Sequence, residues 1–166
     1  MSRWQQIVFG SRETIAGTVY GTIVVMGSIA AGSQGVGIRA SHLAAVVAAT
    51  VLVLWIAHVY SHALAETIRL DRRLDAAELT SVARRELAIP LAAVAPVTAL
   101  VLGSIGVLRE STAVWLALGF GVATLVVDGI RYAAVDRLSR LGTAVTVTVN
   151  LVLGLAIVGL KAALGH

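Results

Sequence analysis

Five long apolar windows limit what this chain can fold into. A helix needs roughly 20 predominantly apolar residues to cross a bilayer. Such windows run near 14–33, 43–66, 87–108, 112–135 and 142–164. Hydrophobic residues make up 58% of the 166-residue chain and charged residues 13%, against about 45–50% and about 25% in soluble domains. We therefore predict one all-α integral membrane domain over residues 1–166, with five transmembrane helices and a cytoplasmic helical hairpin at 67–86.

The basic residues indicate how this domain is oriented. Ten of the thirteen Lys and Arg residues fall on one side of the predicted topology: Arg3, Arg12, Arg69, Arg72, Arg73, Arg84, Arg85, Arg131, Arg137 and Arg140. Short loops rich in Lys and Arg face the cytoplasm, so we expect the N-terminus to be cytoplasmic and the C-terminus to lie outside. The predicted location is the cytoplasmic membrane of a prokaryote, and the predicted partner is lipid rather than nucleic acid. Four hairpin arginines are candidates for contact with headgroups or with a partner protein: Arg72, Arg73, Arg84 and Arg85.

Small residues and prolines predict how the helices pack and bend. Gly17 and Gly21 form a GxxxG step in the first span, which lets helix backbones approach closely in lipid. Pro96 lies inside the third span and should kink it. In the hairpin we expect the chain to break near Leu79–Thr80 and a new helix to begin there.

Polar residues gather in the half of the spans nearest the predicted cytoplasmic side. Six of them are candidates for lining a transport path: Tyr20, His58, His62, Glu66, Asp128 and Asn150. Ionisable groups in a bilayer cost about 2.5–3.5 kcal/mol each even on the gentler scales, so they tend to face a bundle interior and to be functional. Structural roles remain open: Glu66 can pair with Arg69, Asp128 can pair with Arg131, and the two uncharged residues can bond between helices.

The second span carries the most informative polar pattern, WIAHVYSHALAE at 55–66. His58 and His62 are four residues apart and share a helical face, with Glu66 one turn further on. Two imidazoles at this spacing can bind a divalent metal, can be hydrogen-bonded interior residues, or can carry protons. Val59 replaces the glutamate that an HExxH protease needs, and the chain has no cysteine.

The opening of the first span, SRETIAGTVYGTIV, resembles the vacuolar iron transporter (VIT) family. Arg12, Glu13, Gly17 and Gly21 match the family's first helix, while Tyr20 stands where the family has an aspartate. The family's Met-x-x-Gly-Glu segment and following serine align with residues 54–61, which puts His58 at the glutamate. The resemblance implies a five-span fold and a homodimer formed through the first helix, and the GxxxG face at Gly17 and Gly21 fits that dimer packing.

Together these patterns predict a VIT-like homodimer that moves a cation, either a divalent metal or one coupled to protons. The Glu-rich insert of iron-transporting members is replaced here by about twenty residues with five arginines, so the ion is left open. No enzymatic activity and no resident cofactor are predicted. The alternatives are a non-transporting scaffold or regulatory subunit that uses the basic hairpin, and, third, an intramembrane metalloenzyme at His58 and His62.

Overall fold

The computed structural model describes residues 12–34 and 39–164, and every regular element in these ranges is a helix. The helices are α2 (Arg12–Gly32), α3 (Ala40–Leu70), α4 (Ala76–Arg85), α5 (Ala88–Leu91), α6 (Val94–Ser104), α7 (Glu110–Val135) and α8 (Arg140–Leu164). Four of the described helices are long and apolar enough to cross a membrane: α2, α3, α7 and α8. The number rises to five if the bent segment from α4 to α6 counts as one span. The all-helical prediction is confirmed, and the helix lengths are compatible with a membrane protein.

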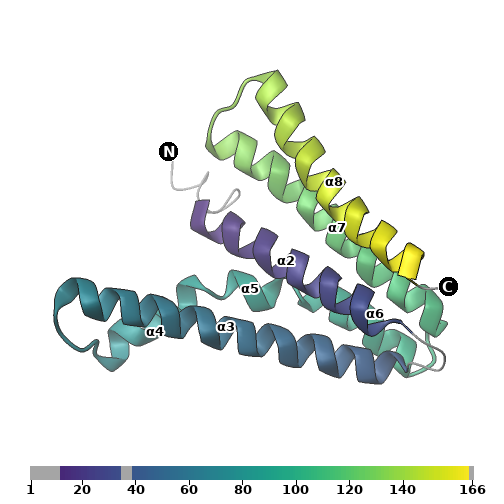
Figure 1. Ribbon diagram of the computed structural model, residues 1–166, viewed down its shortest axis with the longest axis horizontal. Helices are drawn as coiled ribbons and strands as arrows, with labels where there is room; N and C mark the ends of the chain where they lie inside the picture. Colours follow the sequence, from purple (N-terminus) through teal and green to yellow (C-terminus); the bar gives the residue numbers. More distant parts are fainter. Residues whose placement is uncertain (1–11, 35–38, 165–166) are drawn as a thin grey trace.

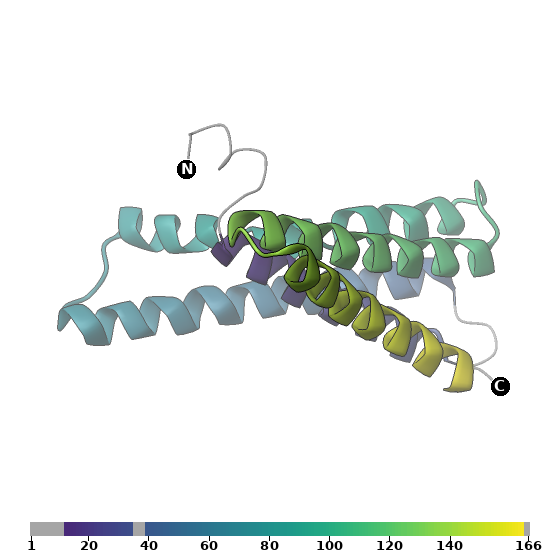
Figure 2. The ribbon, with the colours of Figure 1, turned by 90° about the horizontal axis from the view of Figure 1, so that it is seen from above.

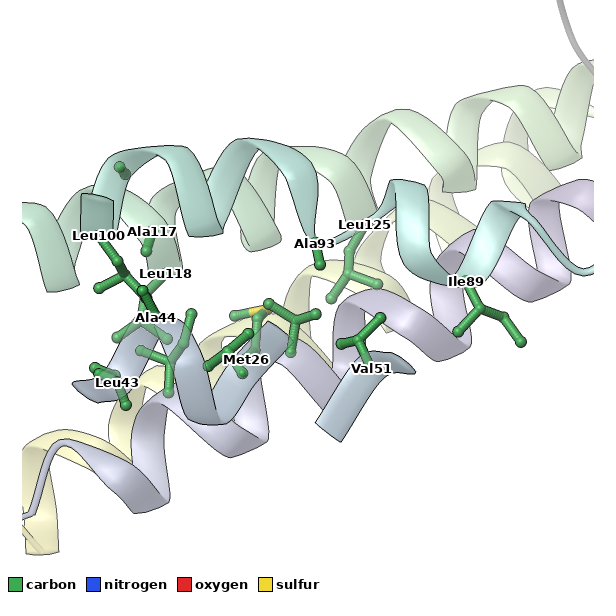
Figure 3. Packing of buried hydrophobic residues seen from close by; sticks show 14 residues of the cluster. Met26, Leu43, Ala44, Val51, Ile89, Ala93, Leu100, Ala117, Leu118 and Leu125 are labelled. Carbon is green, nitrogen blue, oxygen red and sulfur yellow. The ribbon is translucent and has the colours of Figure 1, made fainter. Parts of the chain in front are cut away.

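Helix α2 occupies the middle of the bundle. It runs between α3 on one side and the α7–α8 pair on the other (Figure 1), and it also packs against α5. Val25, Met26 and Ile29 of α2 are completely buried and form the core with residues of α3, α6 and α7 (Figure 3). Larger apolar side chains such as Leu52, Val53 and Ile56 of α3 are exposed on the perimeter, as expected for a surface that faces lipid.

Two prolines determine where the third predicted span breaks. Proline has no N–H to donate to the carbonyl four residues earlier, and its ring clashes with that carbonyl. The position four residues before Pro90 is Glu86, where α4 ends, and the position four before Pro96 is Ala92, where α5 ends. The segments on either side of the second break are inclined by 50°. The kink predicted from Pro96 is therefore present one turn before the proline itself.

The break in the hairpin lies earlier than the sequence suggested. Helix α3 ends at Leu70, and α4 begins at Ala76 rather than near Leu79–Thr80. The reason is a capping box: the Asp75 side chain accepts from the Glu78 N–H at 2.7 Å, and Glu78 accepts from the Asp75 N–H at 2.9 Å. Thr80 lies inside α4.

The hairpin formed by the end of α3 and by α4 projects beyond the other helices (Figure 2). With 31 residues, α3 is about 46 Å long at 1.5 Å per residue, well above the roughly 30 Å thickness of a bilayer core. No residue of α4 is buried. The apolar part of the bent segment therefore begins after α4, at α5.

Gly17 and Gly21 serve a close helix contact within the chain. A Cβ atom on Gly21 would lie 2.7 Å from the Ile89 carbonyl oxygen, and one on Gly17 would lie 3.2 Å from Ala88 Cβ. Both neighbours belong to α5. The small face of α2 thus lets α5 approach, and α5 follows directly after the α4–α5 break at Glu86.

Candidate functional site

The polar site lies where α2, α3 and the α4–α5 junction meet. Tyr20 of α2 contacts His58 of α3, with ring centroids 5.0 Å apart, and the rings of His58 and His62 are 6.3 Å apart. His62 Nδ1 lies 2.7 Å from Oε1 of Glu86. The structure therefore brings three of the predicted path residues into one chain of contacts and adds Glu86 to them.

These residues line a cavity of about 430 Å³, which we call the histidine cavity. Its polar lining is Glu13, Tyr20, His58, His62, Arg85 and Glu86. In the His62–Glu86 pair, Glu86 is the less exposed member: 14% of its side chain is exposed, against 59% for His62. The cavity thus has a half-open mouth at His62 and a shielded carboxylate behind it.

The hydrogen bonds of both histidines fix which ring nitrogen is free. His58 Nδ1 lies 3.1 Å from the Leu54 carbonyl oxygen, which can only accept, so Nδ1 must carry the hydrogen. The same reasoning applies to His62 Nδ1 against the Glu86 carboxylate. In the neutral rings Nε2 then holds the lone pair at both positions. Metal-binding histidines typically have this arrangement, with the second ring nitrogen donating to a carbonyl or carboxylate.

A second cavity of about 390 Å³ lies under the hairpin between α3 and α4. It shares His62, Arg85 and Glu86 with the histidine cavity, and Glu66 also lines it. Glu66 is hydrogen-bonded to Arg69 one turn further along α3. The structural alternative for Glu66, an ion pair with Arg69, is therefore present. Glu66 lines this second cavity and does not line the histidine cavity.

Glu78 of α4 also forms an ion pair with an arginine of the hairpin. Both Arg72 amino groups donate to Glu78, at 2.9 and 2.6 Å. This contact, together with the Asp75 N–H, lowers the pKa of Glu78 to about 2. The hairpin is thus held by a charged cap whose carboxylate stays ionised down to acid pH.

Asp128 and Asn150 do not line the histidine cavity. Asp128 is 1% exposed, and its Oδ1 accepts from Arg131 at 2.9 Å, while no described group donates to Oδ2. Asn150 of α8 lies against Gly129 of α7, 2.9 Å from where a Cβ would be. The single polar layer predicted from the sequence is therefore divided between the histidine cavity and the α7 interfaces.

Glu86 is one of the cavity residues that the sequence-based list of path residues omits, together with Glu13. It follows Arg84 and Arg85, so in the sequence it looks like one more member of a charged surface stretch. The signal that could have found it is its spacing from Pro90, because a helix break four residues before a proline turns the chain. That turn places the carboxylate of Glu86 against His62.

The chain matches no protein-family model, no curated protein and no solved structure. Within residues 12–34 and 39–164, no group of three or more His, Cys, Asp or Glu side chains is placed to hold a metal ion. The site geometry therefore carries the functional argument.

Proposed function

We propose that this protein is a VIT-like cation transporter whose ion, a divalent metal or a proton, passes through the histidine cavity. The observation that carries the proposal is the pair of imidazoles with Nδ1 bound to acceptors and Nε2 free, next to Tyr20 and Glu86. Two nitrogen ligands and a nearby carboxylate suit a borderline divalent ion such as Zn²⁺ or Fe²⁺ better than Ca²⁺, which prefers oxygen. The same groups can pass a proton between them.

The modest number of ligands fits transport rather than storage. A transported ion must bind well enough to enter and weakly enough to leave. His58 and His62 offer two Nε2 atoms. Glu86 is bound to His62, and its carboxylate can turn from His62 to a bound ion. A resident metal centre normally has three or four protein ligands, so an ion in transit is the better match to this set.

We propose further that the working form is a homodimer. The mouth of the histidine cavity opens on the perimeter, where 43% of Tyr20 and 59% of the His62 side chain are exposed. Polar groups are costly against lipid tails, and a second copy across this face would cover them. Because the chain has no cysteine, an Ala16→Cys variant at the mouth provides a single crosslinking site, and a crosslinked dimer in native membranes is the expected result.

The transport proposal is tested by flux into proteoliposomes. We expect uptake of Zn²⁺, Mn²⁺, Fe²⁺ or H⁺ by the wild type and a fall of at least tenfold in His58→Ala and His62→Ala. His42→Ala is the matched control, because His42 lies on the same helix outside the cavity, and its flux should equal that of the wild type. Absence of flux for all four ions, or an equal loss in the His42 variant, contradicts the proposal.

A further inference from the structure

The outer face of α4 carries an open groove that the transport site does not use. Its volume is about 520 Å³, and it is lined by Ala77, Thr80, Ser81, Arg84 and Arg85. Two guanidinium groups and two hydroxyl groups thus face one hollow. Guanidinium groups bind phosphate oxygens in pairs of parallel hydrogen bonds, so the chemistry of this lining suits a phosphate.

The structure divides the hairpin arginines into paired and free ones. Arg69 is bound by Glu66, and Arg72 is bound by Glu78. Arg73, Arg84 and Arg85, by contrast, form no ion pair with any residue in the described ranges. Arg85 also lines both cavities, which leaves Arg84 as the free cation on the outer face.

The residues that follow Arg84 place the groove at the boundary between water and lipid. Residues 76–91 run on as one segment up to the 50° bend that precedes α6, and Leu87 and Leu91 follow Arg84 by three and seven residues, the spacing of one helix side. Both leucines are exposed, by 40% and 65%, and their neighbours Ala88 and Ile89 are buried in the bundle. Arg84, Leu87 and Leu91 therefore form one stripe, which passes from a guanidinium group to exposed apolar side chains where the apolar span begins.

We propose that this stripe is a binding site for an anionic phospholipid. The headgroup phosphate accepts hydrogen bonds from Arg84, with the hydroxyl of Ser81 beside it, and one acyl chain lies along Leu87 and Leu91. An anionic phospholipid fits this stripe because its anionic headgroup is followed directly by an apolar chain. A bound lipid would also tie α4 to the membrane surface next to the Glu86 junction.

The test uses the full-length protein in a neutral detergent, titrated with phosphatidylglycerol while its thermal unfolding is followed. We expect saturable stabilisation of the wild type. The apparent Kd should be about fivefold higher in Arg84→Gln, the factor that corresponds to about 1 kcal/mol per basic residue near an anionic surface. Arg73→Gln is the matched control: the sequence also makes Arg73 a candidate for headgroup contact, but the structure places it in the exposed 71–75 connection outside the groove, and the variant removes the same charge. Its Kd should equal that of the wild type.

Two further arms separate the lipid from other ligands. Phosphatidylcholine of the same chain length should bind at least fivefold more weakly than phosphatidylglycerol, and inorganic phosphate should neither stabilise the protein nor displace the lipid. Equal Kd values for wild type and Arg84→Gln, an equal loss in Arg73→Gln, or displacement by inorganic phosphate would each overturn the proposal. None of these measurements depends on ion transport.

Discussion

The contact between Gly21 and α5 can be tested by adding a single methyl group. In Gly21→Ala the new Cβ would lie 2.7 Å from the Ile89 carbonyl oxygen and 3.1 Å from its Cα, both backbone atoms. Ordinary contact begins at 3.4 Å, so α5 must move by about 0.7 Å, the difference between the two distances. Overpacking of this kind costs about 1–3 kcal/mol.

Gly27→Ala is the matched control on the same helix. No atom lies within 4 Å of a Cβ at Gly27, and both variants gain the same roughly 1 kcal/mol of helix propensity. The difference in free energy of unfolding, measured in mixed SDS and neutral-detergent micelles, should therefore be about 1–3 kcal/mol in favour of Gly27→Ala. Equal stability of the two variants would refute the assigned contact between α2 and α5.

Three other perturbations address the hairpin, the buried carboxylate and the bent span. Arg72 lowers the pKa of Glu78 to about 2, so the ionised carboxylate stabilises the hairpin fully above the unfolded pKa near 4.5. This stabilisation is lost as the pH falls from 4.5 to 2. The unfolding temperature of Glu78→Gln should therefore change less over that range than the unfolding temperature of the wild type. Asp128→Ala removes the hydrogen bond to Arg131 and should lower the free energy of unfolding by about 1.5–3 kcal/mol, measured in the same mixed micelles. Pro96→Ala supplies the missing N–H and should reduce the 50° bend, seen as a changed distance between spin labels on introduced cysteines.

The helical spans were predictable because the hydrophobic length of a membrane sets one dominant pattern. The hairpin break was mislocated, although the sequence contains its signal: Asp75 followed three residues later by Glu78 is a capping-box spacing. Thr80 looked like an equally good cap, and the reciprocal hydrogen bonds between Asp75 and Glu78 show which site is used.

The candidate site was predictable only in part. His58 and His62 share a face because helix geometry fixes their spacing, and the contact of His58 with Tyr20 depends only on α2 lying beside α3. The contact with Glu86 depends on where a proline-induced break turns the chain, and the burial of Asp128 depends on how α7 packs against its neighbouring helices. Such relations between helices are set by packing, which a one-dimensional pattern does not contain.

The position of α8 has a consequence for how the protein assembles during synthesis. The buried core is formed by α2, α3, α5, α6 and α7 and the connection before α6, whereas α8 contributes only partly buried side chains such as Ile157 and Val158. Since α8 follows the other described helices in the chain, the ribosome delivers it after them, onto a surface that α7 and α2 already provide. The histidine cavity is likewise built from residues before α8, so the site can form in the membrane before α8 is synthesised.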